Sequence, residues 1–175
     1  MAKRKKAKSF LGKFGGLIAV IIAVLSALTI ILPGLILKVE NADPTVYKGF
    51  EFVFGKEIAG AGIGGFGGDV SIPFSILGVL GYFLPVVLSV LVALIVKNRQ
   101  LGGMLLLIAF VFGAAILFVM PEITHITTTI KLGDNVSTTA KTFAQMGYKL
   151  DYGTIIGGSL NCLGALFSVA YSFSK

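Results

Sequence analysis

Four long stretches without a charged side chain constrain this chain more than any other feature of its sequence. They cover residues 16–37, 73–96, 101–120 and 153–173. At about 1.5 Å of rise per residue, a helix of each length crosses the roughly 30 Å hydrocarbon core of a bilayer. Hydrophobic residues make up 55% of the chain and charged residues 13%, a balance outside that of soluble domains. The sequence predicts an α-helical integral membrane protein, a four-helix transmembrane bundle forming one membrane domain over residues 1–175.

The distribution of charge predicts how the bundle is oriented. The predicted cytoplasmic segments, residues 1–15, the turn at 97–100 and the C-terminus, carry nine basic residues and no acid, whereas the two loops between them carry all eight acids. Basic residues next to spans stay on the cytoplasmic side, so we expect both termini inside and a multi-pass protein of the plasma membrane. Eight of these nine basic side chains are expected to contact anionic lipid headgroups, and no nucleic acid is expected as a partner. They are Lys3, Arg4, Lys5, Lys6, Lys8, Lys13, Lys97 and Arg99.

The two exported loops are expected to form a small β-sheet. In the first loop, residues 38–72, the stretch 46–54 alternates, with Phe50, Phe52 and Phe54 on one face and Tyr47 on the other. This period of two predicts a strand with one face against the membrane domain, and the glycine-rich stretch 59–68 predicts a turning loop.

The second exported loop, residues 121–152, contains an Ile- and Thr-rich stretch at 123–132. This composition predicts a second strand, which we expect to pair with the first. A turn at 133–135 and a short helix from Ser137 to Gly147 are predicted after it.

Small residues in the last span predict a close helix contact. Gly153 and Gly157 form a GxxxG pair, Gly164 lies on nearly the same face, and Asn161 can donate a hydrogen bond across the contact. The contact is expected within the bundle or between subunits. In the second span, Pro85 removes one backbone hydrogen bond and predicts a kink that is a candidate hinge.

Catalytic and metal-binding patterns are missing from the sequence. None of the four spans carries a charge, which argues against ion-coupled transport. His125 is the only histidine and has one nearby acid, Glu122, while Cys162 is the only cysteine and lies in an apolar span. A lone histidine with one carboxylate is far short of a metal site or a catalytic constellation. We therefore predict no enzyme activity, no metal and no cofactor.

The layout of the chain resembles that of claudin-type tetraspan proteins. It has four spans, both termini inside, a long first loop that contains a strand, and a shorter second loop. The claudin first-loop motif of tryptophan and paired cysteines is absent, since the chain has no Trp and its one Cys lies in a span. The chain is also similar to uncharacterised four-span proteins of Gram-positive bacteria and mollicutes. The features that carry this similarity are the lysine-rich start and the motifs Tyr47-Lys48-Gly49-Phe50 and Phe54-Gly55. This resemblance implies a topology and supplies no activity.

Three functions fit these features. The first is a structural or scaffold protein that self-associates laterally in the cell membrane as a homo-oligomer. The second is a homo-oligomeric pore, which needs polar side chains such as Tyr82, Ser89 and Asn161 at a common axis. The third is an accessory subunit of a membrane complex with an unknown protein partner.

Overall fold

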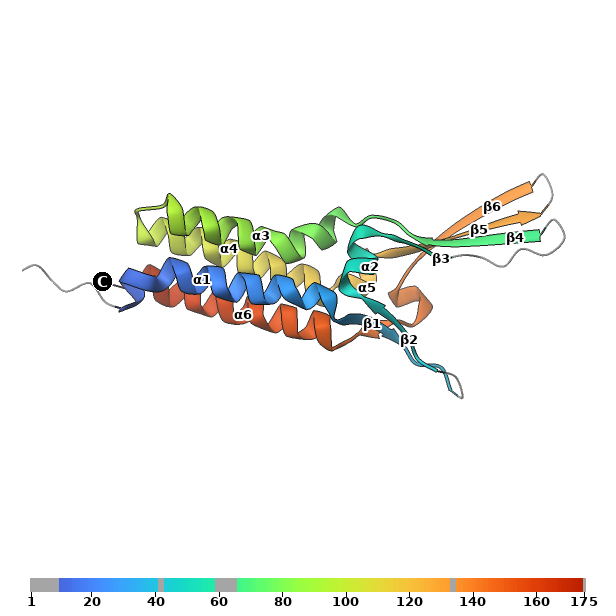
Figure 1. Cartoon of the computed structure of the whole chain (residues 1–175), viewed down its shortest axis with the longest axis horizontal. Helices are drawn as coiled ribbons and strands as arrows, with labels where there is room; N and C mark the ends of the chain where they lie inside the picture. The colour runs from blue at the N-terminus through green and yellow to red at the C-terminus, as the bar shows by residue number, and fades with distance from the viewer. Residues whose placement is uncertain (1–9, 41–42, 59–65, 133–134, 175) are drawn as a thin grey trace, which may run out of the picture.

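The computed structural model describes residues 10–40, 43–58, 66–132 and 135–174, and four long helices dominate it. They are α1 (Phe10–Leu28), α3 (Ile76–Leu94), α4 (Arg99–Phe118) and α6 (Tyr152–Ser172). The four helices lie side by side as a bundle (Figure 1). Each, α1 together with the turn that follows it to Ile31, provides a stretch of at least 18 residues that is long and apolar enough to cross a membrane, as predicted for a multi-pass membrane protein.

The two ends of the bundle differ in structure. At one end, called here the link end, lie the start of α1, the connection between α3 and α4, and the end of α6 (Figure 1). At the opposite end, called the sheet end, the helices meet two β-sheets. Short polar side chains begin three helices: Ser75, Asn98 and Asp151 accept hydrogen bonds from backbone N–H groups of α3, α4 and α6.

The described residues form two antiparallel sheets. The first, ordered β2-β1-β7, contains β1 (Pro33–Leu37), β2 (Thr45–Lys48) and β7 (Lys149–Leu150). The second, ordered β3-β4-β5-β6, contains β3 (Lys56–Ile58), β4 (Phe66–Ile72), β5 (His125–Leu132) and β6 (Asn135–Thr142). The short helices η1 (Thr29–Ile31) and α5 (Met120–Ile123) join the bundle to the sheets, and α2 (Gly49–Phe54) and η2 (Ala144–Met146) join one sheet to the other. The two sheets project from the same end as separate arms (Figure 1).

The first loop differs from its prediction in two places. The last residues of the predicted span 16–37 form β1, because the residue before a proline avoids helical dihedrals, and Leu32 before Pro33 is extended at φ −86° and ψ 161°. The predicted strand 46–54 is a strand only as far as Lys48, and its second half is α2. The helix begins there because the Glu51 carboxylate accepts a hydrogen bond from the Lys48 backbone N–H at 2.8 Å.

Strands of the two loops do pair, as β4 does with β5, but the expected pairing of the strand at 46–54 with the strand at 123–132 is wrong. β2 pairs with β1 of its own loop, whereas β5 lies in the other sheet between β4 and β6. The glycine-rich stretch explains the difference, since its last part, residues 66–68, begins β4 and pairs with β5. Residues 59–65 and residues 133–134 of the predicted turn lie outside the described residues.

The helix predicted from Ser137 is instead β6, which pairs with β5 along all eight of its residues. The β-branched residues Val136, Thr138 and Thr139 favour a strand, and the neighbouring Ile- and Thr-rich β5 offers it a complete ladder. Gly147 does end the helical turn η2, in the left-handed conformation at φ 83°.

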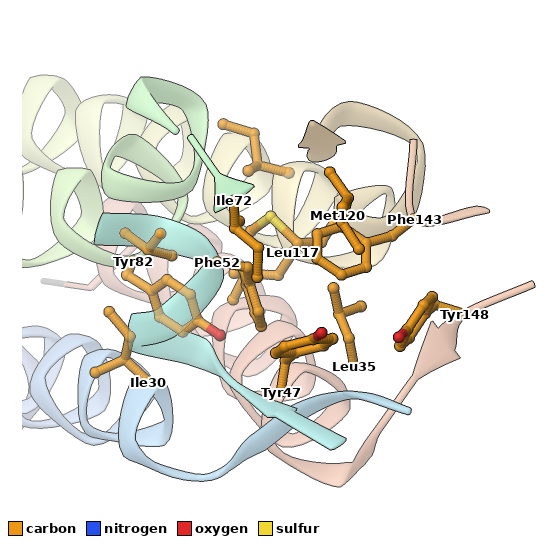
Figure 2. Close-up of a cluster of buried hydrophobic side chains, with 13 residues drawn as sticks. Ile30, Leu35, Tyr47, Phe52, Ile72, Tyr82, Leu117, Met120, Phe143 and Tyr148 are labelled. Atoms are coloured by element: carbon orange, nitrogen blue, oxygen red, sulfur yellow. The ribbon is translucent and has the colours of Figure 1, made fainter. Parts of the chain in front are cut away.

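A cluster of 13 buried residues at the sheet end joins the helices to the sheets (Figure 2). Phe143 lies in this cluster with its ring edge against Tyr148, centroids 5.1 Å apart, and against Tyr47 at 5.6 Å. These three rings come from β2 and from the segments that follow β6 and precede β7. The cluster therefore ties segments of both loops to one core above the bundle.

Replacing Phe143 by alanine should lower the free energy of unfolding by about 3–5 kcal/mol, because the ring is fully buried and leaves a cavity. Thermal unfolding in detergent measures this loss as a lower midpoint. Phe54→Ala is the matched control, since the Phe54 side chain is 53% exposed and should change the midpoint little. Equal effects of the two substitutions would contradict the role of Phe143 as the centre of this core.

Candidate functional site

An arm formed by β4, β5 and β6, called here the β6 arm, projects from the sheet end of the bundle (Figure 1). Six residue pairs join β4 to β5 and eight join β5 to β6. Near the bundle, Ile72 and Ile126 on one face of the arm are buried in the core. Farther along the same face, Ile130 is exposed. The arm is thus anchored at its base and open to its surroundings beyond it.

The opposite face of the β6 arm is polar. The register places Ser71, Thr127 and Ala140 side by side, and one step farther along it aligns Asp69, Thr129 and Thr138. The Thr129 and Thr138 hydroxyl oxygens lie 3.4 Å apart across the strands. Cross-strand threonine pairs of this kind stabilise antiparallel sheets and leave a surface of hydroxyl and methyl groups.

β6 forms one edge of its sheet, and this edge is open among the described residues. Seven of its eight residues are exposed, and only Thr142 is partly covered. A sheet edge presents unpaired backbone N–H and C=O groups that can pair with another strand. Proteins block such edges with charges, prolines or bulges, yet β6 carries one charged residue, Lys141, has no proline and runs in unbroken register. The edge is therefore able to accept another strand.

The predicted aromatic residues divide between the core and the surface. Tyr47 and Phe52 are buried in the cluster of Figure 2, whereas Phe50 and Phe54 are exposed. Because residues 49–54 are helical, the three phenylalanines do not share one face as expected of a strand. Phe52 and its neighbour Val53 point into the core together.

The predicted glycine contact lies inside the chain. A Cβ atom at Gly153 would meet the Pro33 carbonyl oxygen at 2.5 Å, and one at Gly157 would meet the Thr29 hydroxyl. At Gly164 a Cβ would overlap the Phe110 ring of α4. These positions are buried, so they pack α6 against its own neighbours and are not exposed to another subunit.

Polar side chains in the bundle also face inward. Asn161, Tyr82 and Ser89 are each fully buried, so the candidate pore residues do not lie on the outer surface where copies would meet. Pro85 is buried beside Gly113, close to the Asn161 amide. The helix α3 continues through Pro85, and its role as a hinge stays a prediction.

The remaining residues singled out from the sequence lie at both ends and on the outer face of the bundle. At the link end Lys97 is exposed, and Arg99 donates a hydrogen bond to the Ser174 carbonyl oxygen at 3.2 Å. His125 is exposed at the base of β5, and Cys162 is exposed on the surface of α6. Lys3, Arg4, Lys5, Lys6 and Lys8 lie outside the described residues, as does the side chain of Lys13. Among described side chains, no three of His, Cys, Asp or Glu gather into a metal site.

One ion pair joins α2 to the start of β3. Glu51 accepts a hydrogen bond from the Lys56 ammonium at 2.6 Å as well as the bond from the Lys48 N–H. Partial burial raises the pKa of the Glu51 carboxyl, but the Lys56 ammonium and the Lys48 N–H outweigh it and hold the pKa below its usual value. Sequence reasoning missed this pair because it treated residues 49–54 as a strand, where positions 51 and 56 are far apart.

Comparison with known proteins identifies no relative. A scan against protein-family models, a search of curated proteins and a search of solved structures each find no match. The function is therefore argued from the geometry of the β6 arm and the bundle.

Replacing Gly164 by leucine should lower the free energy of unfolding by about 1–3 kcal/mol or more, since the side chain must displace the Phe110 ring. Ala170→Leu on the exposed face of α6 is the control and should leave the midpoint almost unchanged. Thermal unfolding in detergent distinguishes the two. If Gly164→Leu were tolerated as well as Ala170→Leu, the close packing of α4 and α6 at this position would be refuted.

Glu51→Gln should lower stability at neutral pH by about 1 kcal/mol or less, because the Lys56 partner is largely exposed. The folded pKa of Glu51 is lower than the unfolded one, so its stabilising effect is complete above about pH 4.3 and is lost as pH falls through the folded pKa. The difference between the two proteins' thermal midpoints should therefore shrink below pH 4. Glu57→Gln, an exposed carboxylate nearby, is the control, and a difference independent of pH would contradict the ion pair's role.

Proposed function

We propose that this chain is a non-enzymatic tetraspan membrane protein that self-associates laterally as a structural component of the cell membrane. In this proposal the sheets lie outside the cell and the link end lies inside. The orientation is supported by charge, because residues 76–121 and 152–175 contain basic residues and no acid, whereas the sheet-end loops contain all the acids. The observation that carries the self-association is the open edge of β6.

The strand directions favour pairing between copies in the same membrane. β3 runs away from the bundle after α2, β5 does the same, and β6 runs back toward the bundle. The two edge strands of the sheet therefore run in opposite directions. When a second copy stands beside the first with the same orientation, its β3 can pair with β6 in the antiparallel manner.

The register places the two edges at a matching height. Glu57 of β3 aligns with Ser71, which aligns with Thr127 and then with Ala140 of β6. All four positions lie on one face of the sheet. Glu57 and Ala140 thus mark the same level at opposite edges, as required for side-by-side copies in one bilayer. A contact between two different edges is heterologous and continues from copy to copy, so it produces an open row unless the rotation between copies closes it into a ring.

The other two functions have weaker support. A pore between copies would need polar residues on the outer face of the bundle, whereas Tyr82, Ser89 and Asn161 are buried within one chain. An accessory subunit would use the same β6 edge to bind a strand of a different protein. The experiment below separates that outcome from self-association.

Cysteine cross-linking in native membranes tests the row. In a Cys162→Ala background, Glu57→Cys combined with Ala140→Cys should form disulfide-linked ladders of dimers, trimers and higher species on oxidation. In two further pairs, Thr138→Cys or Thr142→Cys takes the place of Ala140→Cys. Each lies two residues away on the same face, so these pairs detect a contact in which β3 and β6 are shifted by two residues. Asp43→Cys combined with Ala140→Cys is the control for random collision, because Asp43 is exposed but lies in the other arm's loop.

Three results would overturn the proposal or redirect it. Monomers alone, with cysteines that still react with maleimide, would exclude the row. Dimers from Ala140→Cys by itself would show β6 paired with β6, which in the antiparallel form requires copies of opposite orientation. A cross-link to a different protein would favour the accessory subunit.

A further inference from the structure

A groove of about 330 Å³ lies between α4 and α6 near the link end of the bundle. Its α4 wall contains Gln100, Met104 and Leu107, and its α6 wall contains Val169, Ser172 and Phe173. The spacing within each set places it on one face of its helix. Met104 is 61% exposed and Phe173 is 80% exposed, so the groove opens on the outside of the bundle. In a membrane this side faces lipid.

The groove results from close packing beneath it. A Cβ at Gly103 would meet the Ser168 carbonyl oxygen at 2.9 Å and would overlap the Ser172 hydroxyl, so the backbones of α4 and α6 nearly touch here. Met104 and Phe173 extend outward on either side of this contact. Small residues at the floor and long side chains at the walls leave a channel parallel to the helices.

The end of the groove nearest the link is polar and positive. Gln100 and Ser172 lie there, and Arg99 reaches the Ser174 carbonyl oxygen beside them. Lys97 is exposed in the adjacent turn. Residues 76–121 and 152–175 contain no acidic side chain that would neutralise these cations. An anion near Arg99 and Lys97 therefore meets no acidic side chain of these segments.

We propose that this groove binds one anionic phospholipid from the leaflet at the link end. An acyl chain lies along Met104, Leu107 and Val169, and the phosphate lies near Arg99 and Lys97. The occupant is a lipid and not free phosphate, because four of the six lining residues are apolar and face hydrocarbon. The site requires only that the four helices span a membrane. The lipid proposal is therefore independent of the proposed contact between copies.

Native mass spectrometry of the purified chain tests the site. The protein is incubated in detergent with equal amounts of phosphatidylglycerol and phosphatidylcholine that carry identical acyl chains. One phosphatidylglycerol should remain bound per chain, with at least fivefold preference over phosphatidylcholine. Val169→Phe fills the groove and should reduce this retention at least fivefold. Val87→Phe, at an exposed position on α3, is the matched control and should retain the lipid.

The positive end of the groove is tested by charge substitutions. Lys97→Gln combined with Arg99→Gln should abolish the preference for phosphatidylglycerol, while Lys97→Gln with Arg99→Lys should restore part of it. Circular dichroism establishes that each variant is folded. Equal retention of the two lipids by the unmodified protein, or undiminished retention by Val169→Phe, would overturn the proposal. Displacement of the lipid by millimolar inorganic phosphate would show a phosphate site and would also contradict it.

Discussion

Backbone groups in hydrocarbon cannot bond to water, and this constraint decides where the four long helices begin and end. Within each helix the backbone bonds are internal, and at the boundaries Ser75, Asn98 and Asp151 accept bonds from the first N–H groups. After α1 and η1 the chain becomes extended at Leu32, just before Pro33. The backbone N–H and C=O groups of β1 then pair with those of β2 and β7. The sheets therefore satisfy backbone groups between strands, as the helices satisfy theirs internally.

Close packing in the bundle depends on small residues, since apolar side chains gain little by leaving lipid for another helix. Gly153, Gly157 and Gly164 each bring α6 against a different neighbour in the same chain. The glycine face of α6 is therefore buried inside the bundle. Uncovered backbone edges lie instead on the sheets, β6 among them, which is why the proposed contact between copies involves strands.

The sequence predicted the four helices because an uncharged stretch of that length has one stable form in a bilayer. It could not predict the sheets as well, because alternation in residues 46–54 fits both a strand and a helix that buries Phe52 and Val53. The strand order depends on contacts between residues far apart in the sequence. β5 pairs with β4, which begins in a glycine-rich stretch whose local pattern predicts a loop. Similarly, the groove between α4 and α6 depends on Gly103 facing Ser168, a pairing that no spacing within one helix reveals.

The position of β7 has a consequence for the order in which the protein is assembled. β1 can pair with β2 soon after both are synthesised, but its other edge pairs with residues 149–150, as Leu35 does with Leu150. Two further bonds join the same place to the last helix: Asp151 N–H and the Thr154 hydroxyl both donate to the Gly34 carbonyl oxygen, each at 2.8 Å. The central strand of the first sheet therefore stays half-paired until residues 149–150 are made, and the same strand then holds the start of the last helix.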